Sequence, residues 1–550
     1  MEKRIFSAVL ISIAILALWG VLFPKLFPQL VKQQQQQQQQ QSAQKGVRSA
    51  QTTTVAPIAK PASVATPAIA PVASSAPIGA SAEKQTIIEG DEFVARFSNR
   101  GGELVSYRLK HYTGKDKQPL ELVKARDLTR GDFPFALETR DPNLTRRLDT
   151  AFYAVAQRNE KNANVLEYRY SDGSFNVTKT FRLGAEYPFD FSVAVNPPIP
   201  YRVVIGPGIR TLAPEERDSQ FIITGNGVVQ VDDKLKILNR EKTDRISTIE
   251  NAQFVGIEDN YFLAALRPVK SGDAIIRRAE LREGDTKETR KELYAGLNGA
   301  SDGTVAGNAF FGPKQTKVLE KYGYASTLQF GFFGFIGRLL LEVLIWLNGI
   351  THNYGWAIIV LTILIKIVLY PLQHKSIVSM KKMQRAQPKV EAIKNKYKKA
   401  RTDAEQRQKM NVETMKLYQQ EGINPMGGCL PIALQLPILW GFYGLLSRAI
   451  ELRGAPFMLW IHDLSAKDPL YITPILMTVT MFIQQLITPT TVDPAQRRMF
   501  LIMPLVFGWI FKEFPSGLVL YWLVQNILTI IQQLIMNKYW KDHPAELNKD

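Results

Sequence analysis

The sequence predicts a polytopic α-helical membrane protein with six spans, five of them in a C-terminal core, and a large all-β sandwich domain outside the cytoplasm. The 550-residue chain divides in two: residues 83–325 alternate polar and apolar side chains, whereas apolar blocks dominate roughly the last 220 residues. Lys366 stands alone in the apolar stretch 354–372, which is long enough to cross a bilayer. A charge at that depth costs roughly 2.5 kcal/mol or more and usually faces a watery cavity or a partner. We therefore expect a working site inside the membrane.

The first 23 residues are predicted to form an uncleaved signal-anchor span. Residues 5–23 carry no charge and run on into Pro24, without the small-residue cleavage site of a secretory signal. Lys3 and Arg4 place the N-terminus in the cytoplasm. Residues 24–82 contain a glutamine run and then an Ala/Pro/Ser/Thr-rich segment that offers little to bury, so we expect a low-complexity tether.

Residues 83–325 are predicted to form an antiparallel β-sandwich. Asp172-Gly173 between two alternating runs is a strong hairpin signal, and Gly101-Gly102 marks another turn. The chain has one cysteine, so no intrachain disulfide can hold this domain together. Its stability must come from its own core.

The sequence carries no recognisable pattern for catalysis, nucleotide binding or metal binding. The five histidines are scattered, and no His-Glu-x-x-His, Gly-x-Ser-x-Gly or paired-cysteine motif is present. Residues 307–314 (GNAFFGPK) resemble a phosphate loop only in their glycine spacing, because Pro313 interrupts the required ending, and we expect a plain loop there. We expect no cofactor, no metal and no enzymatic activity.

Residues 326–350 are predicted to form an amphipathic helix at the membrane interface. The apolar run carries Arg338 and Glu342 on one helical face and ends in the polar pair Asn348-Gly349. If this helix crossed the membrane, the most basic loop of the chain would lie outside, against the preference of basic loops for the cytoplasm.

That loop, residues 374–422, is predicted to form a basic cytoplasmic helical hairpin. Residues 373–421 contain thirteen Lys or Arg and five acidic residues, with a helix-like stretch on each side of a break near residues 400–403. Two interpretations remain open. The hairpin is a docking arm for an acidic or RNA-rich partner, or it is a solvated loop that only fixes the topology.

The remaining apolar blocks complete six spans and return the C-terminus to the cytoplasm. The predicted boundaries are 351–373 for the second span, 423–446 for the third, 447–469 for an outer loop, 470–488 for the fourth span, 489–498 for a cytoplasmic loop, 499–516 for the fifth span, 517–537 for the sixth and 538–550 for a cytoplasmic tail. The apolar part of the fifth span, residues 499–511, would extend only about 20 Å as a helix, against a hydrocarbon core of about 30 Å. Local thinning of the bilayer is expected there.

Polar side chains gather on helical faces of these spans. Thr362 lies one turn from Lys366, and the last span carries a stripe of polar residues from position 522 to position 533. A single polar residue in a span commonly serves helix packing. Together with an unpaired lysine, the set favours a hydrated, positively charged groove. The candidate groove residues are Lys366, Thr362, Gln435, Trp522, Gln525 and Asn526.

Three motifs in this part of the chain resemble the YidC/Oxa/Alb family of membrane protein insertases. They are residues 424–429 (NPMGGC), 457–464 (FMLWIHDL) and 514–522 (FPSGLVLYW). The resemblance covers the whole chain and is strongest from about residue 330. It implies an insertase and chaperone in the inner membrane of a Gram-negative bacterium, with the β-domain in the periplasm and a groove open to cytoplasm and lipid.

The resemblance also implies partners and a role for the groove cation. The implied partners are nascent membrane proteins, the Sec translocon, membrane lipids, and the ribosome and signal-recognition machinery at the basic hairpin and tail, with no DNA. The family's groove charge is most often an arginine, which carries over onto Lys366; its groove threonine matches Thr362 and a frequent tyrosine is Trp522. Lysine lacks the bidentate fork of arginine, which argues against two-pronged binding of a carboxylate. Lys512-Glu513 interrupts a region that is usually more apolar in the family.

A second class of protein, an ion-coupled transporter or channel, stays open because it too would place a lysine in the membrane. Such coupling commonly requires carboxylates near the midplane, and the apolar blocks of the predicted spans contain none. A third reading, a membrane-anchored β-domain, leaves the five C-terminal spans without a purpose.

Overall fold

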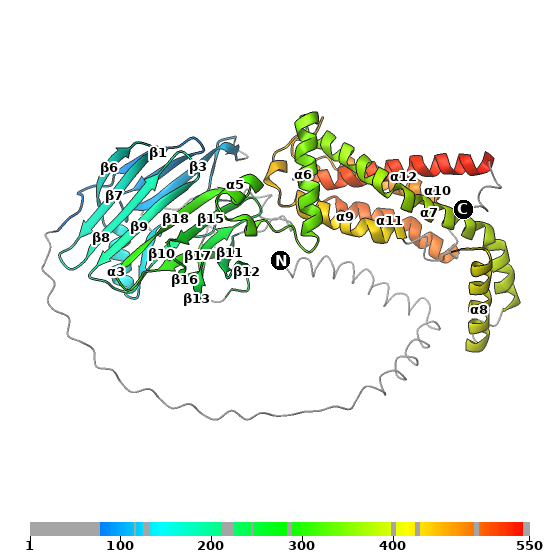
Figure 1. The fold of residues 1–550 in the computed structure, drawn as a ribbon, viewed down its shortest axis with the longest axis horizontal. Helices are drawn as coiled ribbons and strands as arrows, with labels where there is room; N and C mark the ends of the chain where they lie inside the picture. Colours follow the sequence, from blue (N-terminus) through cyan, green and yellow to red (C-terminus); the bar gives the residue numbers. More distant parts are fainter. Residues whose placement is uncertain are drawn as a thin grey trace, which may run out of the picture. The chain divides into compact units, whose positions relative to one another are not determined.

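The structure is a computed structural model that describes residues 77–114, 117–124, 132–211, 225–243, 246–282, 289–397, 403–423, 430–488 and 494–542 (Figure 1). The predicted signal anchor and nearly all of the predicted tether lie outside these residues. The described chain divides into two compact units, of which one holds residues 379–397 and 403–423 and the other holds the rest.

Within the described residues, the β-domain contains three sheets, in each of which hydrogen-bonded neighbours run antiparallel in the order named. The four-stranded sheet consists of β1 (Gln85–Glu89), β2 (Phe93–Ser98), β3 (Glu103–Thr113) and β4 (Pro119–Glu121). The five-stranded sheet consists of β13 (Ile246–Ala252), β16 (Gly272–Arg282), β17 (Thr289–Asn298), β10 (Tyr201–Ile205) and β5 (Ala136–Thr139). The nine-stranded sheet consists of β12 (Lys234–Leu238), β11 (Asn226–Val231), β14 (Phe254–Glu258), β15 (Phe262–Pro268), β18 (Thr304–Pro313), β9 (Pro188–Asn196), β8 (Asn176–Leu183), β7 (Ala163–Ser171) and β6 (Ala154–Glu160). A short helix, α3 (Pro142–Thr150), follows β5.

The period-2 alternation of the sequence produces the core of this domain. In β9 every second side chain is buried, which places Phe189 and Phe191 inside. The Phe135 ring lies 5.4 Å from that of Phe191 and 4.9 Å from that of Phe181, measured between centroids. Packing of aromatic side chains in the core therefore stabilises this domain, as disulfides do in other extracytoplasmic domains.

Both predicted hairpins are present. β7 and β8 pair antiparallel across Asp172-Gly173, where the Asp172 carboxylate accepts hydrogen bonds from the backbone N–H of Ser174 (2.8 Å) and Phe175 (2.9 Å). Gly173 has φ 88°, which a side chain would disfavour. β2 and β3 pair across the turn at Gly101-Gly102.

The prediction of a loop at residues 307–314 is wrong, because most of the segment lies in strand β18. Gly307 pairs with Pro268 on one side and Phe191 on the other, and a Cβ at Gly307 would lie 2.2 Å from the Arg267 carbonyl oxygen. Close approach of two strands, not phosphate binding, therefore requires this glycine. Lys314 forms a buried ion pair with Glu258 at 2.8 Å.

A buried charged cluster lies inside the β-domain. Lys179 is fully buried, and its Nζ donates hydrogen bonds to the carbonyl oxygens of Gly101 (2.5 Å) and Phe135 (2.8 Å). Burial lowers the pKa of Lys179 to about 8 and raises the pKa of the neighbouring Asp149 to about 7. Burial also raises the pKa of Glu103 well above its ordinary value.

The C-terminal part is helical. Its helices are α5 (Thr316–Lys321), α6 (Gly334–Thr351), α7 (Tyr354–Lys396), α8 (Ala404–Gln420), α9 (Leu430–Leu446), α10 (Ile472–Ile487), α11 (Pro494–Phe511) and α12 (Ser516–Asp542). Among the described helices, α6, α7 and α12 are long and apolar enough to cross a membrane. Shorter apolar helices run through Gln435–Leu446, Ile472–Ile487 and Phe500–Phe511.

Two helices extend beyond the apolar blocks that predicted them. α7 continues past the expected boundary at residue 373 to Lys396, through prolines at positions 371 and 388. α11 begins at Pro494, inside the expected loop 489–498, so the whole helix is about 27 Å long at ~1.5 Å per residue. The apolar pattern marks only the part of a helix suited to hydrocarbon and therefore cannot show where a helix continues through polar residues.

α6 is the helix that was expected at the membrane interface. It runs at a steep angle to α9 and α12 in Figure 1 and packs closely on α9, because a Cβ added to Gly337 would lie 3.2 Å from the Gly441 carbonyl oxygen. Leu341 and Leu344 are buried, whereas Phe335 and Trp346 are exposed. Length and composition would also allow α6 to cross a membrane, so its interfacial placement stays a prediction.

The basic segment forms the expected antiparallel pair of helices. Lys389 and Lys396, near the end of α7, form ion pairs with Glu421, just after α8, and with Glu413 within it. The Asp403 carboxylate caps α8 by accepting a hydrogen bond from the Glu405 backbone N–H at 2.9 Å.

Candidate functional site

The buried polar face of α7 carries the candidate cation. Thr362 is fully buried and its hydroxyl donates to the Ile358 carbonyl oxygen at 2.7 Å. Lys366, one helical turn further on, is 8% exposed. Ile367 and Val368, which follow it, are 63% and 74% exposed. α7 therefore presents an apolar face outward and holds its charge inside the helical core.

Lys366 reaches across to α12 and binds a neutral group there. Its Nζ donates to the Thr529 hydroxyl oxygen at 2.9 Å, and Thr529 in turn donates to the Gln525 carbonyl oxygen at 2.7 Å. No carboxylate in the described part of the chain forms an ion pair with Lys366. Thr529 belongs to the polar stripe of the last span but was not among the candidate residues; its position four residues after Gln525 was the available signal.

The other face of α12 packs against α10. The Asn526 side-chain amide donates to the Thr480 hydroxyl at 3.3 Å and the Met477 carbonyl oxygen at 3.5 Å. The Gln533 side-chain oxygen accepts from the Thr488 hydroxyl at 3.3 Å. Asn526 therefore links two helices and does not reach Lys366, although the sequence grouped the two residues together.

The remaining two candidates lie among aromatic side chains. The Trp522 ring lies 5.1 Å from that of Phe511 and 6.2 Å from that of Phe507, between centroids, so Trp522 packs α12 against α11. Gln435 on α9 is a hydrogen-bond partner of the Tyr521 hydroxyl. Of the six candidates, Lys366 is linked through the Thr529 hydroxyl to the backbone carbonyl of Gln525, and Thr362 lies one turn away on α7. The side-chain oxygen of Gln525 itself has no hydrogen-bond partner among the described residues.

Several buried amide groups on α7 and α12 have no hydrogen-bond partner within the described residues. They are the side-chain oxygens of Gln373, Gln525 and Asn537, the side-chain nitrogen of Gln533, and both polar atoms of Gln532. Buried polar atoms are almost always hydrogen-bonded in folded proteins, to water where protein offers nothing. All of these side chains belong to α7 or α12.

The charged pair Lys512-Glu513, which follows α11 and which no pattern in the sequence explains, has partners in the structure. Glu513 forms an ion pair with Lys467 at 3.0 Å. The Lys512 ammonium lies 3.4 Å from the centroid of the Trp509 ring. Lys467 also pairs with Pro515 in an isolated β-bridge, so these charges fasten the loop before α10 to the loop before α12.

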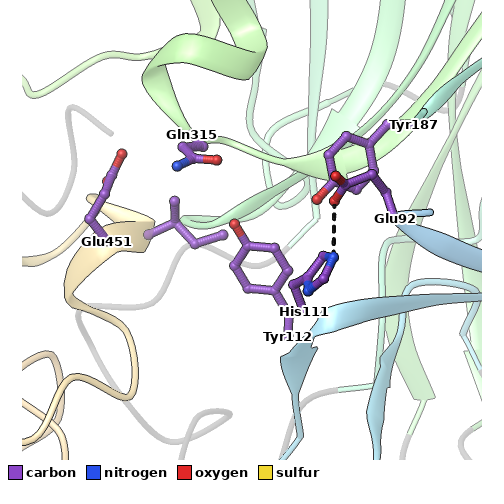
Figure 2. A pocket seen from close by; sticks show the side chains of 7 residues that line it. Glu92, His111, Tyr112, Tyr187, Gln315 and Glu451 are labelled. Atoms are coloured by element: carbon purple, nitrogen blue, oxygen red, sulfur yellow. Dashed lines mark ion pairs between the residues drawn. The ribbon is translucent and has the colours of Figure 1, made fainter. Parts of the chain in front are cut away.

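A separate pocket of about 390 Å³ lies where the β-domain meets the loop after α9 (Figure 2). Its lining includes His111 and Glu92, and the His111 Nε2 atom lies 3.7 Å from the Glu92 Oε2 atom. Glu451 also lines the pocket, and burial raises the pKa of its carboxyl group. Tyr112 and Tyr187 line it as well, and burial raises the pKa of both hydroxyls. The pocket lies outside the site formed by α7 and α12.

Fold and site together define a membrane protein with several apolar helices, an extramembrane β-sandwich and a cation buried among its helices. Two family models match the chain: the 60Kd inner membrane protein over residues 346–543 and the YidC periplasmic domain over residues 85–343. The chain belongs to the YidC family of membrane protein insertases. The β-domain is therefore periplasmic, and membership of this family identifies the chain as an insertase and not a transporter.

Individual relatives match over the full length. The membrane protein insertase YidC of Geotalea daltonii is 34% identical over 98% of this chain and 99% of its own. The YidC of Geobacter metallireducens is 34% identical over 98% of each chain. Among solved structures, an active YidC insertase with its first transmembrane domain resolved matches 83% of this chain and 93% of its own, at 19% identity and a TM-score of 0.36.

Proposed function

We propose that the face shared by α7 and α12 is a hydrated, cationic groove that receives the polar segments of nascent inner-membrane proteins during insertion. The observation that carries this proposal is the environment of Lys366: a buried ammonium whose partner is a neutral hydroxyl. A buried charge without a counter-charge is costly. Its retention is explained if a client supplies the counter-charge.

The chemistry at Lys366 favours exchange of its partner. A client carboxylate would form a charge-assisted hydrogen bond, which is roughly twice as strong as a neutral one, and could take the place of the Thr529 hydroxyl. The Thr529 hydroxyl would then accept a hydrogen bond from water instead of from Lys366. The contact is reversible because lysine offers a single point charge rather than a bidentate fork.

The unsatisfied amides would extend the polar path beyond Lys366. A client's polar tail must cross the hydrocarbon while its apolar helix leaves water. The free amides of Gln373, Gln525 and Gln532 would hydrogen-bond the tail or the waters around it. Transfer of the apolar helix into lipid supplies the driving force, so no nucleotide is needed.

We also propose the six-span topology with both termini in the cytoplasm, on the distribution of basic residues. Single cysteines at Ser301, Val412 and Ser465, in a Cys429→Ser background, are expected to react with a membrane-impermeant reagent from outside, inside and outside respectively. Outside labelling at Val412 would contradict this topology.

The basic hairpin of α7 and α8 is proposed as the contact for the ribosome and signal-recognition machinery, with the Sec translocon as a further partner. Support comes from its charge and from its separation as a compact unit. Deletion of residues 390–416 is expected to impair insertion of ribosome-bound clients, while clients released from the ribosome insert normally.

Photo-crosslinking tests the groove directly. A photoreactive residue replaces Gln532 on the buried face, and a matched one replaces Val368, which is 74% exposed on the outer face of α7. A stalled, polar client tail is expected to crosslink at position 532 and not at 368. Equal crosslinking at both positions would place the client elsewhere.

A further inference from the structure

The outer loop between α9 and α10 carries an exposed apolar tip. Met458 is 46% exposed and Leu459 is 71% exposed. The tip is a tight turn, in which the Phe457 backbone N–H donates to the Ile461 carbonyl oxygen at 3.0 Å and the Ile461 N–H donates to that of Met458 at 3.1 Å. Two large apolar side chains therefore stand at the end of a closed turn.

Leu459 also holds an unfavourable backbone conformation. Its φ is 55°, in the left-handed region that glycine and asparagine adopt far more readily than leucine. In water, neither the exposure of this side chain nor its backbone conformation would be favoured. An apolar environment around the tip would remove the first of these costs and offset the second.

A buried carboxylate holds the segment next to the tip. Asp468, 1% exposed, accepts hydrogen bonds from the Trp460 indole N–H at 3.3 Å and from the Thr473 backbone N–H and hydroxyl at 2.7 and 2.6 Å. Burial acts to raise the pKa of Asp468, but the hydrogen bonds from Thr473, Leu470 and Trp460 together outweigh it, so the pKa lies below its ordinary value. A charged Asp468 therefore fastens the turn to the first turn of α10.

Contacts at the base of the tip place it beside the outer end of α7. The Phe457 ring lies 5.7 Å from that of Trp356, and the Phe457 carbonyl oxygen accepts from the Asn353 side chain at 2.9 Å. Gly355 makes room for this contact, since a Cβ there would lie 2.0 Å from the Phe457 ring. Trp356, 49% exposed in the first turn of α7, is typical of the membrane–water boundary.

The apolar surface continues from the loop onto α10. Leu470 and Tyr471, just before that helix, are 56% and 39% exposed, and Ile475 in its first turn is 58% exposed. These side chains would meet lipid if α10 crosses the membrane. This continuity favours lipid over a soluble partner as the environment of the tip.

We propose that Met458 and Leu459 form a wedge that inserts into the outer leaflet of the membrane and anchors the outer loop to lipid. The proposal rests on α7 and α10 crossing the membrane and does not depend on the groove around Lys366. The strained, rigid turn presents the two side chains to lipid, and Asp468 fixes their position relative to α10.

Depth-dependent fluorescence quenching tests the wedge in the full-length protein in liposomes. Leu459→Cys, in a Cys429→Ser background, carries an environment-sensitive fluorophore. The matched control is Val269→Cys, 77% exposed between β15 and β16 of the β-domain. We expect lipids spin-labelled just below the headgroup to quench the label at 459 several-fold more than the control, and aqueous iodide to quench it several-fold less.

Two results would overturn the proposal. Strong iodide quenching at 459, equal to that at 269, would leave the tip in water. Protection from both quenchers that disappears when the protein is diluted in lipid would mean that a second copy covers the tip. As a further check, the label is placed at Met458→Cys and the neighbouring residue is changed by Leu459→Asn, which removes the apolar side chain but suits the left-handed backbone. The label at position 458 is expected to lose lipid quenching. Unchanged quenching would also contradict the wedge.

Discussion

Gly508→Ala is expected to destabilise the protein although alanine is the better helix former. Gly508 on α11 faces Thr478 on α10, and a Cβ there would lie 2.1 Å from the Thr478 hydroxyl oxygen and 3.2 Å from its Cβ. The hydroxyl now donates to the Pro474 carbonyl oxygen at 2.8 Å. It would have to rotate away, or the two helices would have to separate.

The expected magnitude follows from opposing effects. Replacing glycine by alanine inside a helix gains roughly 1 kcal/mol. Overpacking costs about 1–3 kcal/mol, and the lost hydrogen bond costs about 0.5–1.5 kcal/mol. The free energy of unfolding should therefore fall by roughly 0.5–3.5 kcal/mol, because the contact at 2.1 Å is too short to be relieved by small shifts.

Thermal unfolding of the full-length protein in nanodiscs measures this effect. Gly349→Ala on α6 is the matched control, since a Cβ there would meet nothing within 4 Å, and it is expected to leave the melting temperature unchanged or slightly raised. Thr478→Ala combined with Gly508→Ala should recover part of the loss. If Gly508→Ala melts like the control, the close packing of α10 on α11 is not as described.

Two further predictions concern the charged groups outside the membrane. Because burial raises the pKa of Asp149 from 3.8 to about 7, the folded β-domain binds more protons than the unfolded chain between these values, so its free energy of unfolding should fall as pH rises through that window. Urea unfolding at several pH values should show this slope, and Asp149→Asn should reduce it; a rise in stability over the same window would contradict the burial of Asp149. In the hairpin, Lys396→Ala should leave the melting temperature nearly unchanged, because its ion pair with Glu413 is exposed to solvent. A thermal melt that loses many degrees would show that this pair is structurally essential.

The sequence predicted those features that depend on local patterns. The Asp172-Gly173 hairpin follows from turn chemistry, and the helices that carry the apolar blocks follow from hydropathy. The shared face of Thr362 and Lys366 follows from the helical period. These features needed no knowledge of distant contacts.

The features that were missed depend on contacts between segments far apart in the chain. Asn526 shares a helix with Gln525 but faces α10, which only the packing of the helices determines. Glu513 finds its partner at Lys467, 46 residues away. Residues 307–314 carry a loop-like glycine pattern because two neighbouring strands approach closely, a requirement that the segment alone does not reveal.

The charge of Lys366 is the central claim, and insertion into liposomes by charge variants tests it most directly. Single-span clients that differ only in an acidic or a neutral translocated tail are compared at matched protein levels by protease protection. Lys366→Arg is expected to retain insertion of both clients. Lys366→Met, which keeps the bulk of the side chain without its charge, is expected to lose several-fold more insertion of the acidic client than of the neutral one. Equal losses for the two clients would contradict a role for charge attraction at Lys366.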